Sequence, residues 1–274
     1  MTQIRSADES VGIEQFSLAG DVALVTGATG HLGGMMVEAL AAAGAHVLVN
    51  SRRPHAAADL ANALCRRGLQ ASATVFDITD AAATTAAVEQ LATRHGHLDI
   101  LVNNAHAGRP ATIAATLPAD FTGAFSVAVD APFFLIRQLL PLMEAAAGRR
   151  RGGASVINIS SMYGTVSPDP SIYGDSGQNS AAYYGAAKGA LNQLSRYLAV
   201  HLAPRAIRVN TISPGPFPGA AAPADFVTRL AAKVPLGRVG EAREIGGPLL
   251  FLASSASAFV TGANLAVDGG WTAW

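Results

Sequence analysis

Cysteine is nearly absent from this sequence of 274 residues, which contains one, Cys65. A single cysteine forms no disulfide within the chain and supplies no thiolate cluster for a metal. The seven histidines show no metal-ligand spacing with acidic residues or with Cys65. We therefore expect no metal site, and we expect a reducing compartment, the cytoplasm.

The chain also lacks an excess of charge of either sign and a long uninterrupted apolar run. Nineteen Lys and Arg balance nineteen Asp and Glu, so the basic surplus that binds nucleic-acid backbones is missing. Half the residues are apolar, but no uninterrupted run reaches the roughly 18 residues that cross a bilayer. Residues 1–15 carry acids and no apolar core of a secretory signal. Neither nucleic acid nor membrane is an expected partner.

Short β-rich apolar runs alternate with longer Ala- and Leu-rich stretches of helical period. This alternation is typical of successive βα units on a parallel sheet. The expected strands are 22–26, 46–50, 71–76, 100–103, 155–159, 207–212 and 264–267. The expected helices are 32–43, 56–67, 81–95, 120–147, 182–202 and 241–254. The sequence thus predicts one α/β domain at 18–274, a Rossmann-type doubly wound parallel sheet of seven strands, after a polar N-terminal arm at 1–17.

Two segments interrupt this rhythm, 164–180 and 213–223, and both are rich in Gly and Pro. Such segments form loops, and these two follow the fifth and sixth expected strands, at the sheet edge where ligands bind. We expect them to wall a substrate site. The basic run Arg149-Arg150-Arg151 lies between a helix and a strand, and we expect a solvated connection there.

A glycine-rich turn, TGATGHLG at 26–33, lies between the first expected strand and the next helix. Glycine permits close approach to a pyrophosphate, and a helix N-terminus offers free N–H groups to anions. After the second strand stand Ser51, Arg52 and Arg53, where NAD-binding proteins usually place a carboxylate. A guanidinium instead binds the 2′-phosphate of NADP. We expect a site that prefers NADP(H), with NAD(H) as the alternative, and Arg52 as a better phosphate ligand than Arg53.

Tyr184 and Lys188 lie four positions apart on the expected helix 182–202, hence on one face. A cation beside a phenol lowers the pKa of the phenol, which allows proton exchange with an alcohol or ketone near neutral pH. Tyr183 lies five positions from Lys188 and points to another side of the helix, so we expect it to pack.

The order of these and further motifs resembles the short-chain dehydrogenase/reductase family, from about residue 18 to 270. The further motifs are DITD at 77–80, NNA at 103–105, NISS at 158–161, SPG at 213–215, VTG at 260–262 and VDGG at 267–270. This resemblance implies the same fold and a nicotinamide-dependent redox reaction.

The resemblance also implies residue roles. Tyr184 would be the general acid/base, Lys188 a ribose ligand that shifts the tyrosine's pKa, and Ser161, rather than Ser160, the holder of the substrate oxygen. Asp77 would meet the adenine, and Asn103 would line the cofactor channel. The full implied cofactor set is Gly27, Thr29, Gly30, His31, Leu32, Gly33, Ser51, Arg52, Arg53, Asp77, Ile78, Asn103, Ala105, Tyr184, Lys188, Pro214, Gly215 and Phe217.

The chain departs from the family pattern near the expected site. His106 stands where the family usually has a glycine after NNA. Its expected role is either that of a proton carrier or that of a passive residue in the cavity wall. Ala128 stands where the family has an asparagine that links the lysine to solvent, and Asp130 is a nearby alternative polar group. We expect the backbone carbonyl of Ala128 to retain part of the asparagine's role.

The separation of 23 positions between Ser161 and Tyr184 is longer than is usual in the family. The extra loop, 168–180, is polar, which suggests a substrate with hydroxyl or amide groups; the alternative is a surface insertion or subunit contact. A similar loop occurs in members that resemble gluconate 5-dehydrogenase and nonulosonic-acid biosynthesis proteins. Its polar side chains are Asp169, Tyr173, Asp175, Gln178 and Asn179.

Together these features predict an NADP(H)-dependent oxidoreductase that transfers a hydride between a nicotinamide and the carbonyl or secondary alcohol of a small polar substrate. Two alternatives stay open: a relative that performs dehydration or epimerisation, and a scaffold that binds nucleotide without turnover. Family members commonly form dimers or tetramers through two long helices, and an apolar surface on one of them predicts a homo-oligomer. The residues that suggest this surface are Phe133, Phe134, Leu135, Leu139 and Leu142.

Overall fold

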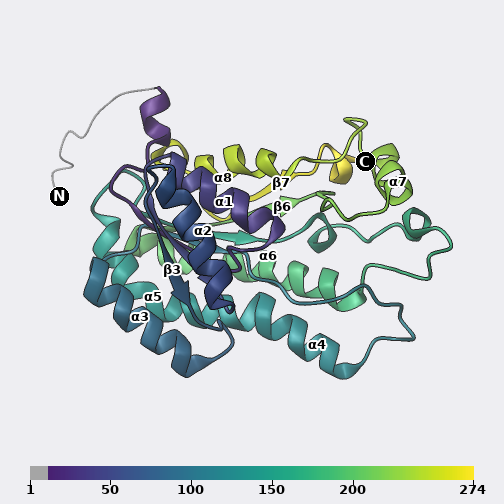
Figure 1. Ribbon diagram of the computed structural model, residues 1–274, viewed down its shortest axis with the longest axis horizontal. Helices are drawn as coiled ribbons and strands as arrows, with labels where there is room; N and C mark the ends of the chain where they lie inside the picture. The colour runs from purple at the N-terminus through teal and green to yellow at the C-terminus, as the bar shows by residue number, and fades with distance from the viewer. Residues whose placement is uncertain (1–11) are drawn as a thin grey trace.

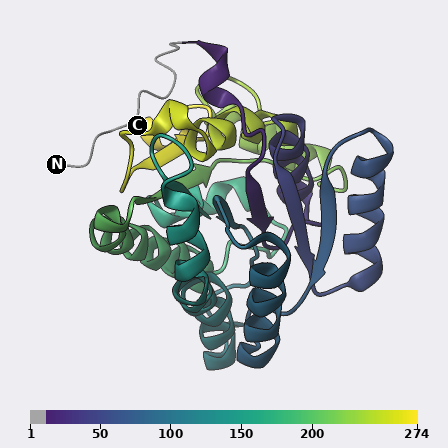
Figure 2. The ribbon, with the colours of Figure 1, turned by 90° about the vertical axis from the view of Figure 1, so that its left-hand side faces the viewer.

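The computed structural model describes residues 12–274 and shows a parallel sheet between two layers of helices (Figures 1 and 2). The described residues form seven strands: β1 (Val22–Val25), β2 (His46–Ser51), β3 (Ala71–Val75), β4 (Ile100–Asn103), β5 (Ala154–Ile159), β6 (Ile207–Pro214) and β7 (Asn264–Val267). Their order is β3-β2-β1-β4-β5-β6-β7, and all neighbours are parallel. From β1 the chain adds β2 and β3 on one side of the sheet, and then crosses over to add β4 to β7 on the other side of β1. The predicted doubly wound fold is confirmed.

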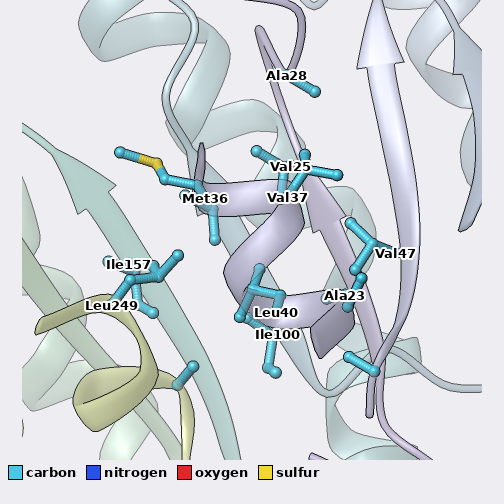
Figure 3. Packing of buried hydrophobic residues seen from close by; sticks show 14 of the residues in the cluster. Ala23, Val25, Ala28, Met36, Val37, Leu40, Val47, Ile100, Ile157 and Leu249 are labelled. Carbon is cyan, nitrogen blue, oxygen red and sulfur yellow. The ribbon is translucent and has the colours of Figure 1, made fainter. Parts of the chain in front are cut away.

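Three helices cover each face of the sheet. One layer holds α1 (His31–Ala42), α2 (Pro54–Arg66) and α8 (Gly246–Ala253); the other holds α3 (Ala81–His95), α5 (Ala131–Ala147) and α6 (Ala182–Leu202). Because strand side chains alternate between faces, Val25 packs under the first layer and Leu24 under the second. Burial on both faces explains why the strands read as continuous apolar runs. Figure 3 shows Val37 and Leu40 of α1 in the first of these cores.

The expected helix 120–147 is divided into three segments. These are α4 (Pro118–Phe125), a π-helical turn at Ser126–Asp130, and α5. Among the described residues, this run of 30 is long and apolar enough to cross a membrane by length and composition alone. One face of it, with Leu135, Leu139 and Met143, packs into the core of the second layer.

Helix α7 (Ala224–Lys233) was not predicted. It follows a proline-rich segment and has one buried side chain, Leu230, so its sequence lacks a broad apolar face. Of the expected arm at 1–17, most lies outside the described residues; in the described part, a 3-10 turn, Ile13–Phe16, precedes the fully buried Leu18. The carbonyl of Gln15 accepts a hydrogen bond from Ser255 Oγ at 3.0 Å. The arm boundary stays a prediction.

The prediction of a solvated connection at 149–151 was wrong for Arg150, whose side chain is 14% exposed, whereas Arg149 and Arg151 are exposed. Arg150 Nη1 lies 2.6 Å from Asp21 Oδ2, and Arg149 Nε lies 3.3 Å from Asp99 Oδ1. Asp21 and Asp99 are buried just before β1 and β4, and buried carboxylates require charged or hydrogen-bonding partners. The basic run therefore forms ion pairs at the amino edge of the sheet.

Candidate functional site

A cavity of about 640 Å³ opens at the carboxyl edge of the sheet, around the reversal of strand order between β1 and β4. Parallel sheets bind ligands at such a point. This edge lies toward the right of Figure 1, where the loops around α7 gather. All of the predicted catalytic and cofactor-binding residues except Asn103 line the cavity, so the fold brings together segments as distant as 27–33 and 214–217.

The glycine turn forms one end of the cavity. Gly27 has φ +60°, and a Cβ there would lie 2.8 Å from Ala105 Cα. A Cβ on Gly33 would collide with the Gly27 carbonyl oxygen and lie 2.9 Å from Asn104 Nδ2. Gly30 precedes α1 and offers no capping side chain, so the first N–H groups of the helix are available to an anion. The turn is therefore shaped for close approach of a phosphate group.

Asn103 is the one predicted site residue that the fold places elsewhere. Its side chain is buried, and its Nδ2 donates to Asn158 Oδ1 at 2.8 Å. The next residue, Asn104, lines the cavity instead and donates from Nδ2 to the carbonyls of Thr26 and Gly27, at 3.1 and 3.0 Å. Alternation along β4 turns Asn103 away from the cleft, and the paired asparagines in the sequence were the signal for Asn104.

Ser51, Arg52 and Arg53 line the cavity beyond the glycine turn. The hydroxyls of Ser51 and Thr29 are 3.1 Å apart, and Arg53 Nη2 donates to Thr29 Oγ1 at 3.3 Å. Arg52 is mostly exposed, and its Nη1 lies 3.5 Å from Asp77 Oδ2. One guanidinium group and two hydroxyls thus meet at Thr29, and Arg52 lines the same cavity beside Asp77. Together they offer donors suited to a phosphate monoester.

Ser161, Tyr184 and Lys188 lie at the other end of the cavity. Ser161 follows β5, and its hydroxyl is hydrogen-bonded to the phenol of Tyr184. Lys188 is buried on α6, and its Nζ donates to the Ile159 carbonyl at 2.7 Å. This hydrogen bond fixes the ammonium 5.9 Å from the centroid of the Tyr184 ring.

The expected lowering of the Tyr184 pKa by Lys188 is not what this geometry produces. Burial raises the pKa of the Tyr184 phenol, and the opposing influence is the Ser161 hydrogen bond. Burial also lowers the pKa of Lys188 to about 8. The ammonium is directed to the Ile159 carbonyl rather than to the phenol, so Ser161 is the direct partner of the tyrosine.

Comparisons with known proteins agree with this arrangement. The protein-family profile described as enoyl-(acyl carrier protein) reductase matches residues 27–272. Galactitol 2-dehydrogenase (L-tagatose-forming) of Cereibacter sphaeroides is 38% identical over 266 residues, which cover 94% of this chain and 98% of that protein. The chain belongs to the short-chain dehydrogenase/reductase family. It is therefore a nicotinamide-dependent oxidoreductase.

Solved structures of short-chain dehydrogenase/reductases match the whole fold. A gluconate 5-dehydrogenase from Burkholderia cenocepacia J2315, in complex with NADP and tartrate, aligns with a TM-score of 0.85 and 33% identity, over 95% of this chain and 98% of that chain. An NADP complex of RhlG from Pseudomonas aeruginosa also has a TM-score of 0.85, with 34% identity over 94% of this chain and 98% of that chain.

Two departures from the short-chain dehydrogenase/reductase pattern lie near Tyr184. His106 lines the cavity, and its ring centroid is 6.0 Å from that of Tyr184. Ala128 is buried in the π-helical turn and packs in a small cluster with Tyr183 and Ala187. Asp130, the suggested alternative polar group, is exposed and does not line the cavity. The chain thus has an imidazole beside Tyr184 and no polar side chain at position 128.

The long loop 164–180 does not line the cavity, so its predicted role as a substrate wall was wrong as to direct contact. Ile172 of this loop is buried against Leu230 and Val234, beside Trp271. Asp169 Oδ2 lies 2.8 Å from Lys233 Nζ, at the end of α7. The loop packs on α7 because its one apolar 3-10 turn, Pro170–Tyr173, finds an apolar partner there rather than at the sheet.

Proposed function

We propose that this protein is an NADP(H)-dependent oxidoreductase that transfers a hydride between the nicotinamide and a carbonyl or secondary alcohol, with Tyr184 as general acid/base. The observation that carries the proposal is one continuous cavity with a phosphate-binding end and a Ser161/Tyr184/Lys188 end. Its volume of about 640 Å³ lies within the range of ordinary ligand sites.

The residues present fit NADP(H). Glycine at 27 and 33 lets the turn pack closely on Ala105 and Asn104, and the free N–H groups at the start of α1 would hold the pyrophosphate. Ser51, Arg52 and Arg53 would hold the 2′-phosphate, and Asp77 and Ile78 would flank the adenine end. Pro214, Gly215 and Phe217 would cover the nicotinamide end. When bound, the nicotinamide supplies or accepts the hydride.

The chain's own residues position the substrate and move one proton. Ser161 and Tyr184 share a hydrogen bond, so a carbonyl oxygen that binds both groups takes the place of that bond. Burial keeps the Tyr184 phenol protonated, and during reduction the phenol donates its proton to this oxygen. Lys188, fixed by the Ile159 carbonyl, places a positive charge beside the site and favours the tyrosinate that forms. Oxidation reverses these steps.

The substrate class is small and polar, with a polyol or sugar acid as the first choice. The named activities of the relatives on galactitol and gluconate support this class, and so does the mixture of Ser161, Tyr184 and His106 at the reacting end. Dehydration and epimerisation are less well supported, because the three groups needed for carbonyl reduction are all in place.

The first test is a fluorescence titration of the purified protein with NADPH and with NADH. We expect NADPH to bind at least tenfold more tightly, since a charge-assisted hydrogen-bonded pair contributes about 1.5–3 kcal/mol. Arg52→Ala and Arg53→Ala, measured separately, should weaken NADPH binding and leave NADH binding unchanged. Turnover is then assayed with galactitol, gluconate and the corresponding keto-sugars.

Each result of the titration has a distinct meaning. Equal affinity for NADPH and NADH would remove the phosphate preference and keep the redox reaction. No binding of either cofactor would reject the proposed function. Binding and turnover that survive Tyr184→Phe would reject the tyrosine as general acid/base.

We further propose a homo-oligomer in the cytoplasm. Leu135, Leu139 and Leu142, predicted as an intersubunit surface, are buried in the protein's own core, whereas Phe134 is 46% exposed. On the neighbouring helix α6, Tyr197 and Val200 are 54% and 72% exposed. These three side chains give α5 and α6 apolar surface available for pairing. Sedimentation as a monomer would reject the proposal.

A further inference from the structure

His106 lies beside Tyr184 at one end of the cavity. It lines the same cavity as Ser161 and Tyr184, and its ring meets the Tyr184 ring edge to face, with centroids 6.0 Å apart. The side chain is exposed to the cleft rather than packed in the core. His106 is therefore next to the group that we propose as the general acid/base, within reach of a substrate bound to it.

The segment that carries His106 is held on both sides. Before it, the backbone N–H of Ala105 donates to Thr26 Oγ1 at 3.1 Å. After it, the Tyr183 hydroxyl donates to the Arg109 carbonyl at 2.7 Å and accepts from the Arg109 N–H at 3.1 Å. The N–H of Ala111 donates to the Asn179 carbonyl at 3.1 Å, in the loop 164–180. Fixed neighbours keep the entropic cost of placing the imidazole low.

The hydrogen bonds of the ring define what it offers to a substrate. Crowding by the surrounding protein lowers the pKa of His106, and the positive charge of Lys188 lowers it further, so the ring is neutral near pH 7. A neutral imidazole carries its proton on one ring nitrogen, and the backbone of Ala107 favours a proton on the ring. The other nitrogen is then an acceptor, which a hydroxyl group can satisfy and a ketone or ether oxygen cannot.

We propose that His106 accepts a hydrogen bond from a hydroxyl on the carbon adjacent to the reacting carbon, and so selects α-hydroxyketones and vicinal diols over plain ketones and alcohols. In such substrates the two neighbouring oxygens lie about one hydrogen-bond length apart, so one binds Tyr184 and Ser161 while the other reaches His106. This proposal rests on the proposed function and adds the substrate class of the same site.

The test compares two ketones that differ by one hydroxyl: 3-hydroxy-2-butanone and 2-butanone. The kcat/KM of each is measured from NADPH oxidation with the full-length protein. We expect a preference of at least tenfold for the hydroxyketone, the factor that 1.4 kcal/mol supplies. In His106→Phe, which removes the acceptor, the ratio of the two kcat/KM values should fall at least fivefold. His106→Asn and His106→Gln, which restore an acceptor oxygen, should recover part of the ratio in at least one variant.

Arg109→Ala is the matched control. It alters an exposed side chain on the same segment, while the backbone of residue 109 keeps its bonds to Tyr183, so the ratio should not change. NADPH affinity and thermal unfolding of every variant show whether the site and fold are intact.

A wild-type ratio near one, or a ratio that persists in His106→Phe, would overturn the role of His106 while the proposed function stands. NADPH binding without reduction of 3-hydroxy-2-butanone would also overturn it, since an α-hydroxyketone is the class that the site is inferred to take. Failure to bind NADPH at all would instead reject the proposed function.

Discussion

Tyr183 and Tyr184 are adjacent in the sequence, yet their hydroxyls have different partners. The Tyr184 phenol lines the cleft and is hydrogen-bonded to Ser161. The Tyr183 ring is 1% exposed, and its hydroxyl binds the backbone of Arg109. A rotation of about 100° per residue around the helix separates the two directions.

Phenylalanine at each of these positions should therefore have opposite effects. Tyr184→Phe removes the proton donor, and we expect kcat to fall roughly 10²- to 10⁴-fold with a change in unfolding free energy below about 1 kcal/mol. Tyr183→Phe leaves backbone groups of Arg109 without partners and should cost about 1–3 kcal/mol of stability while kcat stays measurable. Urea unfolding and steady-state kinetics distinguish the two. Equal effects of both substitutions on kcat would contradict the different roles of Tyr183 and Tyr184.

The pKa of Lys188 predicts how kcat/KM depends on pH. Burial holds its pKa at about 8 in the folded protein, so the ammonium is present below that pH and is lost as the pH rises through it. Tyr184 adds no loss in this range because burial raises its pKa. The kcat/KM for NADPH, which reports the free enzyme, should be flat below pH 8 and fall about tenfold per unit well above it. In Lys188→Met the residual rate should lack this fall. A wild-type profile that stays flat to pH 9.5 would contradict the assignment.

At the scale of single residues, the sequence predicted the site correctly where the spacing of two residues placed them on one face of a helix. The four-residue interval between Tyr184 and Lys188 placed both at the cavity. It was insufficient where one residue decides between faces: Asn103 and Asn104 could not be told apart without knowing where β4 ends. The direct partner of Tyr184 was also beyond the sequence, because the hydrogen bond from Lys188 to the Ile159 carbonyl depends on how β5 and α6 approach each other.

Among the elements, α7 and the loop 164–180 depend on each other. Ile172 is 1% exposed and lies beside Leu230 and Val234, and Arg229 Nε donates to the Ile172 carbonyl at 2.7 Å. Tyr173 stacks obliquely on Phe226, with centroids 5.7 Å apart. Neither element carries enough apolar surface to bury alone, which is why the sequence predicted the first as a polar loop and missed the second.

Ile172→Ala should loosen this pair. Removal of the side chain leaves a cavity, which at a fully buried site lowers stability by about 2–5 kcal/mol. We expect this destabilisation to cause local opening rather than global unfolding. Limited proteolysis should cut within 164–180 faster, while NADPH affinity is kept because this loop does not line the cavity. Lys233→Ala is the control: its ion pair with Asp169 is exposed and should contribute less than about 1 kcal/mol. Unchanged proteolysis in Ile172→Ala would show that the loop is held by other contacts.

In the whole molecule, the two edges of the sheet have different roles. The cavity occupies the carboxyl edge, and the ion pairs of Asp21 with Arg150 and of Asp99 with Arg149 close the amino edge. Arg150 also donates from Nη2 to the carbonyl of Ala253, the last residue of α8, at 2.7 Å. These contacts connect the start of β1, the segment before β5 and the end of α8.

Arg150→Met should therefore reduce stability without disturbing the cofactor site. Leaving Asp21 buried without its partner should cost about 3–5 kcal/mol, measured by urea unfolding, whereas the NADPH dissociation constant should stay within about twofold. Arg205→Met is the comparison, since Arg205 pairs with Glu144 at an exposed position and should cost below about 1 kcal/mol. A loss of NADPH affinity in Arg150→Met at temperatures where the protein is folded would show coupling between the two edges.

The sheet was predictable at this scale because seven apolar runs at regular intervals leave little choice other than a doubly wound arrangement. The ion pairs at the amino edge were not predictable. Asp21, Asp99 and Arg150 are far apart in the sequence and come together only through strand order. The arginine run alone resembles any exposed basic turn.

The packing of the loop 164–180 on α7 has a consequence for exchanging parts between relatives. Its apolar contacts are with α7, Met162 and Trp271, and the two main cores of the sheet do not include it. A chimaera that takes this loop from another enzyme without the matching α7 would leave Leu230 and Val234 facing a foreign surface. The two segments should therefore be exchanged together to keep this part of the fold intact, while the glycine turn and Ser51 to Arg53 line the cavity apart from them and can be replaced to change the cofactor.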